Sequence, residues 1–314
     1  MKKYSFILRF IVTAVLLYIV YSTIDKRLLI SIIKNSRISF LIIGLIIFII
    51  SNITGAVQWY FLLRSQRINI SVYPVLKIYL IGTFFNNFMP GNIGGDVVKA
   101  YKLIKEKSQA EIVISSVVWD RITSFIILYF FSIISGFFLF NSFIFINLVI
   151  GSIFIIFIFI ILILKFNLGG MFLKLSLKIP YPNIRIFVYD FFKSFKKYII
   201  FSKEILFFYL ISITTQFLKI FIQVMINSAF NFTLNLSEIY FFIPLIGIVS
   251  ALPISINGIG FREFLGKYFA IFINRESDII SFFLTVGNII IILGNLIGIV
   301  FLFDKNPSVN HTKA

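Results

Sequence analysis

The stretch FFNNFMPGNIGGDVVKAYKL, residues 84–103, interrupts a very apolar sequence. Its central eleven residues hold three asparagines, a proline, three glycines and an aspartate, and they follow the apolar run that begins at Val72. Proline ends a helix, and glycine permits a tight turn and close backbone approach. We therefore expect one helix to stop near Pro90 and another to begin near Asp96.

The composition explains why this break matters. The chain has 314 residues, of which 60% are hydrophobic and 13% are charged, whereas soluble domains carry roughly 25% charged residues. Several apolar segments approach or exceed the roughly 20 residues that cross a bilayer, and none alternates like a strand. We expect an all-α polytopic membrane protein, a single integral membrane domain over residues 1–314. Its eight hydrophobic segments are 5–24, 38–63, 72–89, 111–140, 142–164, 204–230, 238–256 and 279–303.

Several kinds of chemistry are excluded or disfavoured. The chain has no cysteine, and His311 is its one histidine, so disulfides, thiolate chemistry and a His/Cys metal cluster are excluded. We expect no metal, no cofactor and no catalytic residue. We attribute the net charge of +17 to basic residues that keep loops on the cytoplasmic side and contact anionic lipid headgroups. We expect no nucleic-acid partner. The N-terminus lacks a signal-peptide cleavage site, which favours a retained first span.

A second break lies in LPISINGIGFREFLGKYF, residues 252–269. Each break is interpreted either as part of a full crossing or as the turn of a re-entrant hairpin. Full crossings would put the basic segments 64–71 and 97–109 on opposite sides of the membrane. Hairpins put them on one side, together with most of the lysines and arginines, as the positive-inside rule favours. The four basic residues of loop 24–37 are the weak point of this arrangement.

The hairpin topology predicts about six full transmembrane helices and two oppositely oriented re-entrant helical hairpins. It makes residues 1–141 and 142–314 inverted-repeat halves, a plan known from transporters, with both termini cytoplasmic. The basic segment 165–203 interleaves aromatics with lysines. It either lies on the inner surface against anionic headgroups or only connects the halves.

The first break predicts an anion site at the N-terminus of its outgoing helix, where N–H groups are free. Asp96 either takes part in that site or only caps the helix. The segment GNIGGD lacks the spacing of a phosphate-binding P-loop. The candidate substrate-binding residues here are Asn86, Asn92, Gly94, Gly95 and Asp96.

The second break repeats this pattern from the other side. Glu263 is favourable at a helix start, whereas Arg262 is less natural there. A functional anion contact for Arg262 competes with a capped turn whose arginine reaches lipid headgroups. The candidate residues are Asn257, Gly258, Gly260, Arg262 and Glu263.

Charged residues also lie within the spans. In SSVVWDRITSF, residues 115–125, Asp120 and Arg121 are about ten residues inside the membrane, or roughly 14 Å. Charges at that depth are costly and are usually paired or face a cavity. Because adjacent helix positions do not face each other, each needs its own partner. Asp96, Arg262 and Glu263 are candidates, and a purely structural ion-pair network is the alternative.

A polar face is predicted on the span 204–230. Gln216, Lys219 and Gln223 have i, i+3 and i+7 spacing, which places them on one side of a helix. We expect Gln216 and Lys219 to line a cavity, with snorkelling of the lysine to the interface as the alternative. In the second span, Gln58 is a weaker candidate and Trp59 is interpreted as an interfacial anchor.

Three motifs together resemble a known family. MPGNIGGDVVKAYKL, the intramembrane DRITS and LPISINGIGFREF, in this order and spacing, are similar to the lysylphosphatidylglycerol synthase transmembrane region, also called the flippase-like domain family. The resemblance implies a multi-span domain associated with lipid flipping, typically of aminoacylated phosphatidylglycerol. It points to Asn86, Pro90, Gly94, Gly95, Asp96, Arg121, Pro253, Gly258, Gly260 and Glu263. The chain has no room for the soluble aminoacyl-transfer domain, so we expect no enzyme and no lysyltransferase activity.

These observations predict a lipid translocase of the cytoplasmic membrane that moves a phosphate-bearing lipid or a lipid-linked glycan. One alternative is a non-transporting partner of envelope glycan or aminoacyl-lipid biosynthesis enzymes. A membrane-embedded transferase acting on lipid-linked substrates is a third possibility. The outer loops offer it no convincing carboxylate pair.

Overall fold

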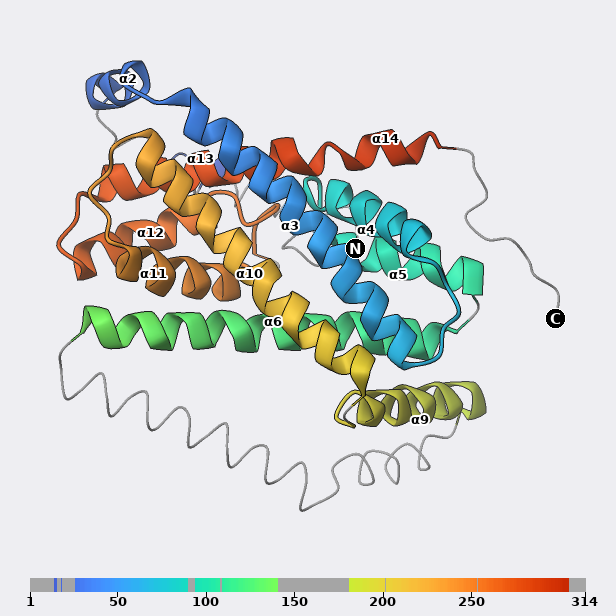
Figure 1. Ribbon diagram of the computed structural model, residues 1–314. Coiled ribbons are helices and arrows are strands. Elements are labelled where there is room, and N and C mark those ends of the chain that lie inside the picture. The colour runs from blue at the N-terminus through green and yellow to red at the C-terminus, as the bar shows by residue number, and fades with distance from the viewer. Residues whose placement is uncertain are drawn as a thin grey trace.

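The computed structural model describes residues 26–89, 94–107, 109–140, 181–200, 202–252 and 254–304, together with Ala14, Val15 and Tyr18. The regular elements within these ranges are all helices, as the sequence predicts (Figure 1). They are α2 (Lys26–Lys34), α3 (Ile38–Ser65), α4 (Val72–Asn86), α5 (Gly94–Lys107), α6 (Ala110–Leu139), α9 (Pro182–Lys197), α10 (Lys203–Ala229), α11 (Leu236–Val249), α12 (Phe261–Phe272), α13 (Ser277–Asn295) and α14 (Gly298–Leu302).

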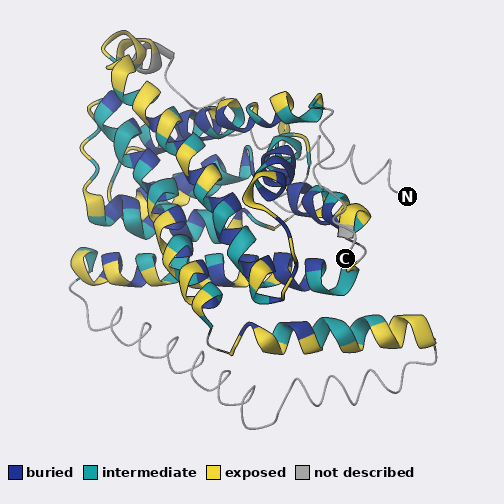
Figure 2. Cartoon of the chain, turned by 45° about the vertical axis from the view of Figure 1, so that its right-hand side comes forward, coloured by how far each residue is buried: buried dark blue, intermediate teal, exposed yellow. Residues whose placement is uncertain are grey.

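Four helical segments of the described chain are long and apolar enough to cross a membrane. They are α3, α6, α10 and the segment Ser277–Leu302, which contains α13 and α14. Large apolar side chains such as Ile46 on α3 and Phe130 on α6 are exposed, as lipid contact requires. Figure 2 shows exposed residues along the outward faces of the long helices. The predicted span 142–164 lies outside the described residues, as does the span 5–24 apart from Ala14, Val15 and Tyr18. The chain is therefore a multi-pass membrane protein, and the total of six full spans stays a prediction.

The first pair of short helices, α4 and α5, packs together and is too short for each helix to cross a bilayer alone. Gly82 and Gly95 let the two backbones approach closely, because a Cβ on Gly82 would lie 2.7 Å from the Gly95 carbonyl oxygen. The ends of this pair lie where α3 ends and α6 begins, which we call the basic end of the molecule. There Lys77 Nζ lies 3.1 Å from Asp304 Oδ2, beyond the end of α14.

The second pair of short helices, α11 and α12, begins and finishes at the opposite end of the molecule. The ring of Phe140, just after α6, lies 5.4 Å from that of Phe272 at the end of α12. Near the start of the pair, Glu238 Oε1 lies 3.0 Å from Nη2 of Arg275. In contrast to α4 and α5, these two helices pack mainly on others, α11 on α6 and α12 on α13.

The two pairs approach each other from opposite ends, and their turns meet in the middle of the molecule (Figure 1). The backbone N–H of Asn257, in the second turn, donates a hydrogen bond of 3.2 Å to the carbonyl oxygen of Met89, in the first. Each half thus has the described order of a long helix, two short helices and a long helix. The inverted repeat of the complete halves stays a prediction, because nearly all of the first span of one half and the whole first span of the other lie outside the described residues.

Two apolar clusters surround the meeting point. One packs Trp59 and Leu63 of α3 with α4, α5 and the start of α6. The other packs Phe48 of α3 with α10, α11, α12 and α13, and Phe283 lies within it. The middle of the molecule, between these clusters, is where polar side chains collect.

Helix α9 lies at the basic end (Figure 2). Gln66, after α3, donates a hydrogen bond of 2.8 Å from Nε2 to the carbonyl oxygen of Ser194 in α9, and Tyr198 stacks on Trp119 of α6. This helix belongs to the predicted connector 165–203, of which residues 165–180 lie outside the described part. Its contact with a lipid surface stays a prediction.

Candidate functional site

The N-terminus of α5 is held by a side chain of the preceding helix. The backbone N–H of Gly95 donates a hydrogen bond of 2.7 Å to Asn86 Oδ1, which satisfies one of the free donors of a helix start. A Cβ on Gly95 would overlap the carbonyl oxygen of Gly82, so the position needs glycine. Asn86 therefore caps α5, the role for which the sequence suggests Asp96. Asn92 and Pro90 lie outside the described residues.

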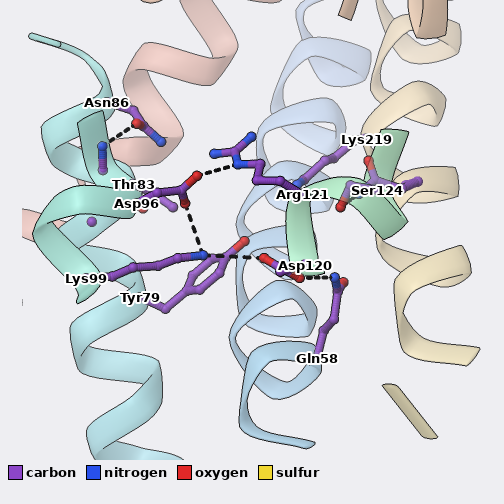
Figure 3. Close-up of a pocket in the computed structure, with 13 residues that line it drawn as sticks. Gln58, Tyr79, Thr83, Asn86, Asp96, Lys99, Asp120, Arg121, Ser124 and Lys219 are labelled. Carbon is purple, nitrogen blue, oxygen red and sulfur yellow. Dashed lines mark hydrogen bonds and ion pairs between the residues drawn. The ribbon is translucent and has the colours of Figure 1, made fainter. Parts of the chain in front are cut away.

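Asp96 instead joins a buried ion network with residues of α5 and α6 (Figure 3). Its carboxylate accepts a short hydrogen bond from Arg121 Nε, and Oδ1 lies 3.1 Å from Lys99 Nζ. The same Nζ lies 3.3 Å from Asp120 Oδ2. Two carboxylates and two cations thus alternate, and their formal charges cancel. Gln58 on α3 completes the network with a hydrogen bond of 2.5 Å from Nε2 to Asp120 Oδ1.

Lys99 is the member that the sequence misassigned. Its place in the basic segment 97–109 suggests a loop lysine, yet its side chain is 4% exposed. Its ammonium lies 5.1 Å from the ring centroids of both Trp59 and Tyr79, a distance at which cation–π attraction operates. The prediction that Trp59 is an interfacial anchor is wrong, because Trp59 is fully buried and donates a hydrogen bond to Ser116 Oγ.

The polar face of α10 borders the network. Gln216 Nε2 donates a hydrogen bond of 3.0 Å to Ser124 Oγ on α6. Lys219 lines the same pocket as Asp96, Lys99, Asp120 and Arg121 (Figure 3). Within the described residues it has no ion-pair or hydrogen-bond partner. The predicted placement of Gln216 and Lys219 beside a cavity agrees with the geometry.

At the second break, Glu263 has a capping role. Its Oε2 accepts a hydrogen bond of 2.8 Å from the backbone N–H of Gly260, and its Oε1 accepts one of 2.7 Å from Asn288 Nδ2. Arg262 donates from Nη1 to Asn288 Oδ1 at 2.7 Å. Neither residue pairs with Asp120 or Arg121, contrary to the sequence-based suggestion.

The described part of the second turn, within residues 250–260, contains left-handed backbone and unsatisfied polar atoms. Asn257, Gly258 and Gly260 have φ angles of 51°, 74° and 78°, values that favour glycine and asparagine. Pro253 lies outside the described residues. Four buried polar atoms around this turn lack a hydrogen-bond partner within the described chain: Ser250 Oγ, Ser255 Oγ, Asn257 Oδ1 and Arg262 Nε.

A central cavity of about 220 Å³ connects these features. Its walls come from α3, α4, α6, α10, α11, α12 and α13. Three cationic side chains line it, namely Arg121, Lys219 and Arg262. Its polar wall also includes Asn52, Asn86, Ser124, Gln216, Gln223, Asn288 and Asn295. The cavity therefore brings together residues from both breaks, and it suits an anionic group.

The acidic residues of the site bear on whether it could bind a metal ion. Among the described residues, no cluster of three or more His, Cys, Asp or Glu side chains could hold a metal ion.

The role of Asn288 could not be predicted from the sequence, because a single asparagine in an apolar helix carries no local signal. Lys99 could have been found, since its i, i+3 spacing from Asp96 on a helix indicates a possible pair.

Comparisons with known proteins agree with this architecture. Residues 6–298 match the family described as the lysylphosphatidylglycerol synthase TM region. The chain is similar to the UPF0104 membrane protein PH1989 of Pyrococcus horikoshii, with 33% identity over 125 residues, which cover 39% of this chain and 36% of that relative. The match thus spans about a third of the relative's length. No solved structure matches the chain at a significant level. The chain belongs to the lysylphosphatidylglycerol synthase transmembrane-region family.

Proposed function

We propose that the protein is a lipid translocase that moves a phosphate-bearing lipid, or a lipid-linked glycan, across the cytoplasmic membrane. The observation that carries the proposal is the pair Lys219 and Arg262. Both line the central cavity, and neither has an ion-pair partner among the described residues. An unpaired charge within a membrane is costly and marks a substrate path more often than a structural site.

The proposal includes an orientation. The α4–α5 and α11–α12 pairs are re-entrant hairpins that enter the bilayer from opposite faces, with the basic end in the cytoplasm. The cavity then lies near the midplane, as substrate sites do in inverted-repeat transporters. The headgroup occupies the cavity while the acyl chains stay in the bilayer, and no chemical step is required.

The experiment is a transport assay in proteoliposomes that contain the full chain and a fluorescent phosphatidylglycerol. A membrane-impermeant quencher reports the fraction of probe in each leaflet. Lys219→Gln should reduce the transport rate at least tenfold at normal protein abundance. Lys34→Gln is the control, because Lys34 is exposed on α2 and does not line the cavity. Equal rates for the wild type and Lys219→Gln would refute the proposal.

A non-transporting role in an envelope-biosynthesis complex has one observation in its favour. The network of Asp96, Lys99, Asp120 and Arg121 is satisfied internally, as an ion cluster with a purely structural role would be. That function predicts that changes in the cavity lower abundance and cellular activity in parallel. Loss of activity at normal abundance for Lys219→Gln would exclude it.

A further inference from the structure

The charges of the cavity distinguish between kinds of lipid headgroup. No carboxylate lines the described walls of the central cavity. Asp96 and Asp120 line the adjacent pocket, which shares Arg121 and Lys219 with it, and they already contact Arg121 and Lys99. Glu263 does not line the cavity and is engaged with Gly260 and Asn288. Among the described residues that line the cavity, Lys219 and Arg262 are the cations without an ion pair to a carboxylate. The described walls therefore carry unneutralised positive charge and offer no unengaged carboxylate.

A lysyl-ester headgroup is poorly matched to such walls. It carries a phosphate, but also an α-amino and an ε-ammonium group, so its net charge is positive. Like charges at close range repel strongly where water is scarce. Neutral acceptors such as Gln223 Oε1 and Asn257 Oδ1 are unsatisfied here, but only a carboxylate also offsets the charge of a buried ammonium. The carboxylates nearby are engaged by cations. A headgroup whose charged groups are all phosphates is instead attracted by the cations of Lys219 and Arg262.

We infer, on the basis of the proposed function, that the cavity takes headgroups whose charged groups are all phosphates and discriminates against aminoacylated headgroups. This separates the cargo of the chain from the lysyl lipid in its family's name. Lys219 is the residue that sets the preference. No hydrogen-bond or ion-pair partner among the described residues holds it away from the cavity, whereas Arg262 is also held by Asn288.

Binding to the purified full chain in detergent tests the inference by calorimetry. The probes are dioctanoyl phosphatidylglycerol, its lysyl ester and inorganic phosphate. The wild type should bind phosphatidylglycerol at least tenfold more tightly than the lysyl ester. Lys219→Gln should reduce that preference at least fivefold, and Lys219→Glu should reverse it. Lys34→Gln should keep the wild-type values, and gel filtration checks that each variant is folded.

Several results would overturn the inference. One is binding of the lysyl ester by the wild type that is as tight as, or tighter than, that of phosphatidylglycerol. If Asp96→Asn then lost this binding, Asp96 would have exchanged its contact with Arg121 for one with the ammonium. An unchanged preference in folded Lys219→Gln is another. Tighter binding of inorganic phosphate than of phosphatidylglycerol would assign the site to free phosphate.

The same probes separate this inference from the proposed function. Transport of the lysyl ester in proteoliposomes, at a rate equal to that of phosphatidylglycerol, would refute the inference and leave a lipid translocase standing. Selective binding of phosphatidylglycerol without transport of any lipid would support the inference and refute the translocase.

Discussion

The two breaks look alike in sequence, yet the structure satisfies them differently. At the first, Asn86 caps α5, and Asp96 is held by two cations. At the second, Glu263 caps α12, but Ser250 Oγ, Ser255 Oγ and other buried polar atoms have no partner among the described residues. The described part of the first break, which excludes residues 90–93, is thus held by a helix cap and ion pairs. The second keeps polar groups available for water or a ligand.

The two helix pairs also differ in whether their members pack on each other or on neighbouring helices. Helices α4 and α5 are joined through Gly82 and Gly95, whereas α11 and α12 pack mainly on neighbouring long helices. A pair that is held together internally moves as one body. A pair whose members are attached to different neighbours can open when those neighbours shift. The comparison predicts larger stability losses from changes at the first break than at the second.

The largest expected effect is that of Asp96→Asn. It leaves the buried Lys99 with Asp120 as its one described carboxylate partner and takes the ion pair from the half-buried Arg121. Breaking a buried ion pair from one side costs about 3–5 kcal/mol. Thermal unfolding of the purified protein in detergent should show a clearly lowered midpoint. The double variant Asp96→Asn, Arg121→Gln should recover part of the loss. A single variant as stable as the wild type would show that the network does not hold the first pair together.

Gly95→Ala should cost about 2–3 kcal/mol, because its Cβ overlaps a backbone oxygen of Gly82 that cannot move cheaply. Gly247→Ala on α11 is the matched control. There the nearest atom to the added Cβ is Leu128 Cδ1 at 3.9 Å, and alanine is the better helix former. Unfolding midpoints should therefore move in opposite directions for the two variants. A shift of the same sign in both would contradict the close packing of α4 on α5.

Gly258→Ala should cost about 1–2 kcal/mol, since alanine is strained at a φ of 74°. The added Cβ would also lie 3.0 Å from Arg262 Nε, so the variant should weaken the binding of dioctanoyl phosphatidylglycerol. Asn257→Gly keeps the left-handed backbone without strain and should leave the unfolding midpoint nearly unchanged. Wild-type stability and binding in Gly258→Ala would mean that the second turn adapts freely.

The smallest effect is expected for Ser250→Ala. Its hydroxyl has no hydrogen-bond partner within the described chain, so its removal should change the free energy of unfolding by no more than about 0.5 kcal/mol. The same measurement as for Asp96→Asn gives the comparison directly. A loss above about 2 kcal/mol would reveal a partner for Ser250 and would remove the contrast between the two breaks.

The positions of the breaks could be predicted from sequence because proline, glycine and charge are local signals. The boundaries of α10 and α6 lie within one residue of the segments predicted from hydrophobicity, and the polar face with Gln216 and Lys219 follows from helical spacing. The partners could not be predicted, since they depend on which helices become neighbours. Trp59 illustrates this, because its hydrogen bond to Ser116 joins α3 to α6, and nothing near Trp59 in the sequence indicates it.

The meeting of the two turns at Met89 and Asn257 has an electrical consequence. If the pairs enter from opposite faces of the bilayer, this contact lies near the middle of the membrane, so a headgroup that passes Lys219 and Arg262 crosses the membrane potential. A unit charge that crosses the full potential changes its free energy by about 2.3 kcal/mol per 100 mV. An energised cell membrane is negative inside, so outward movement of an anionic headgroup is driven downhill by the voltage itself.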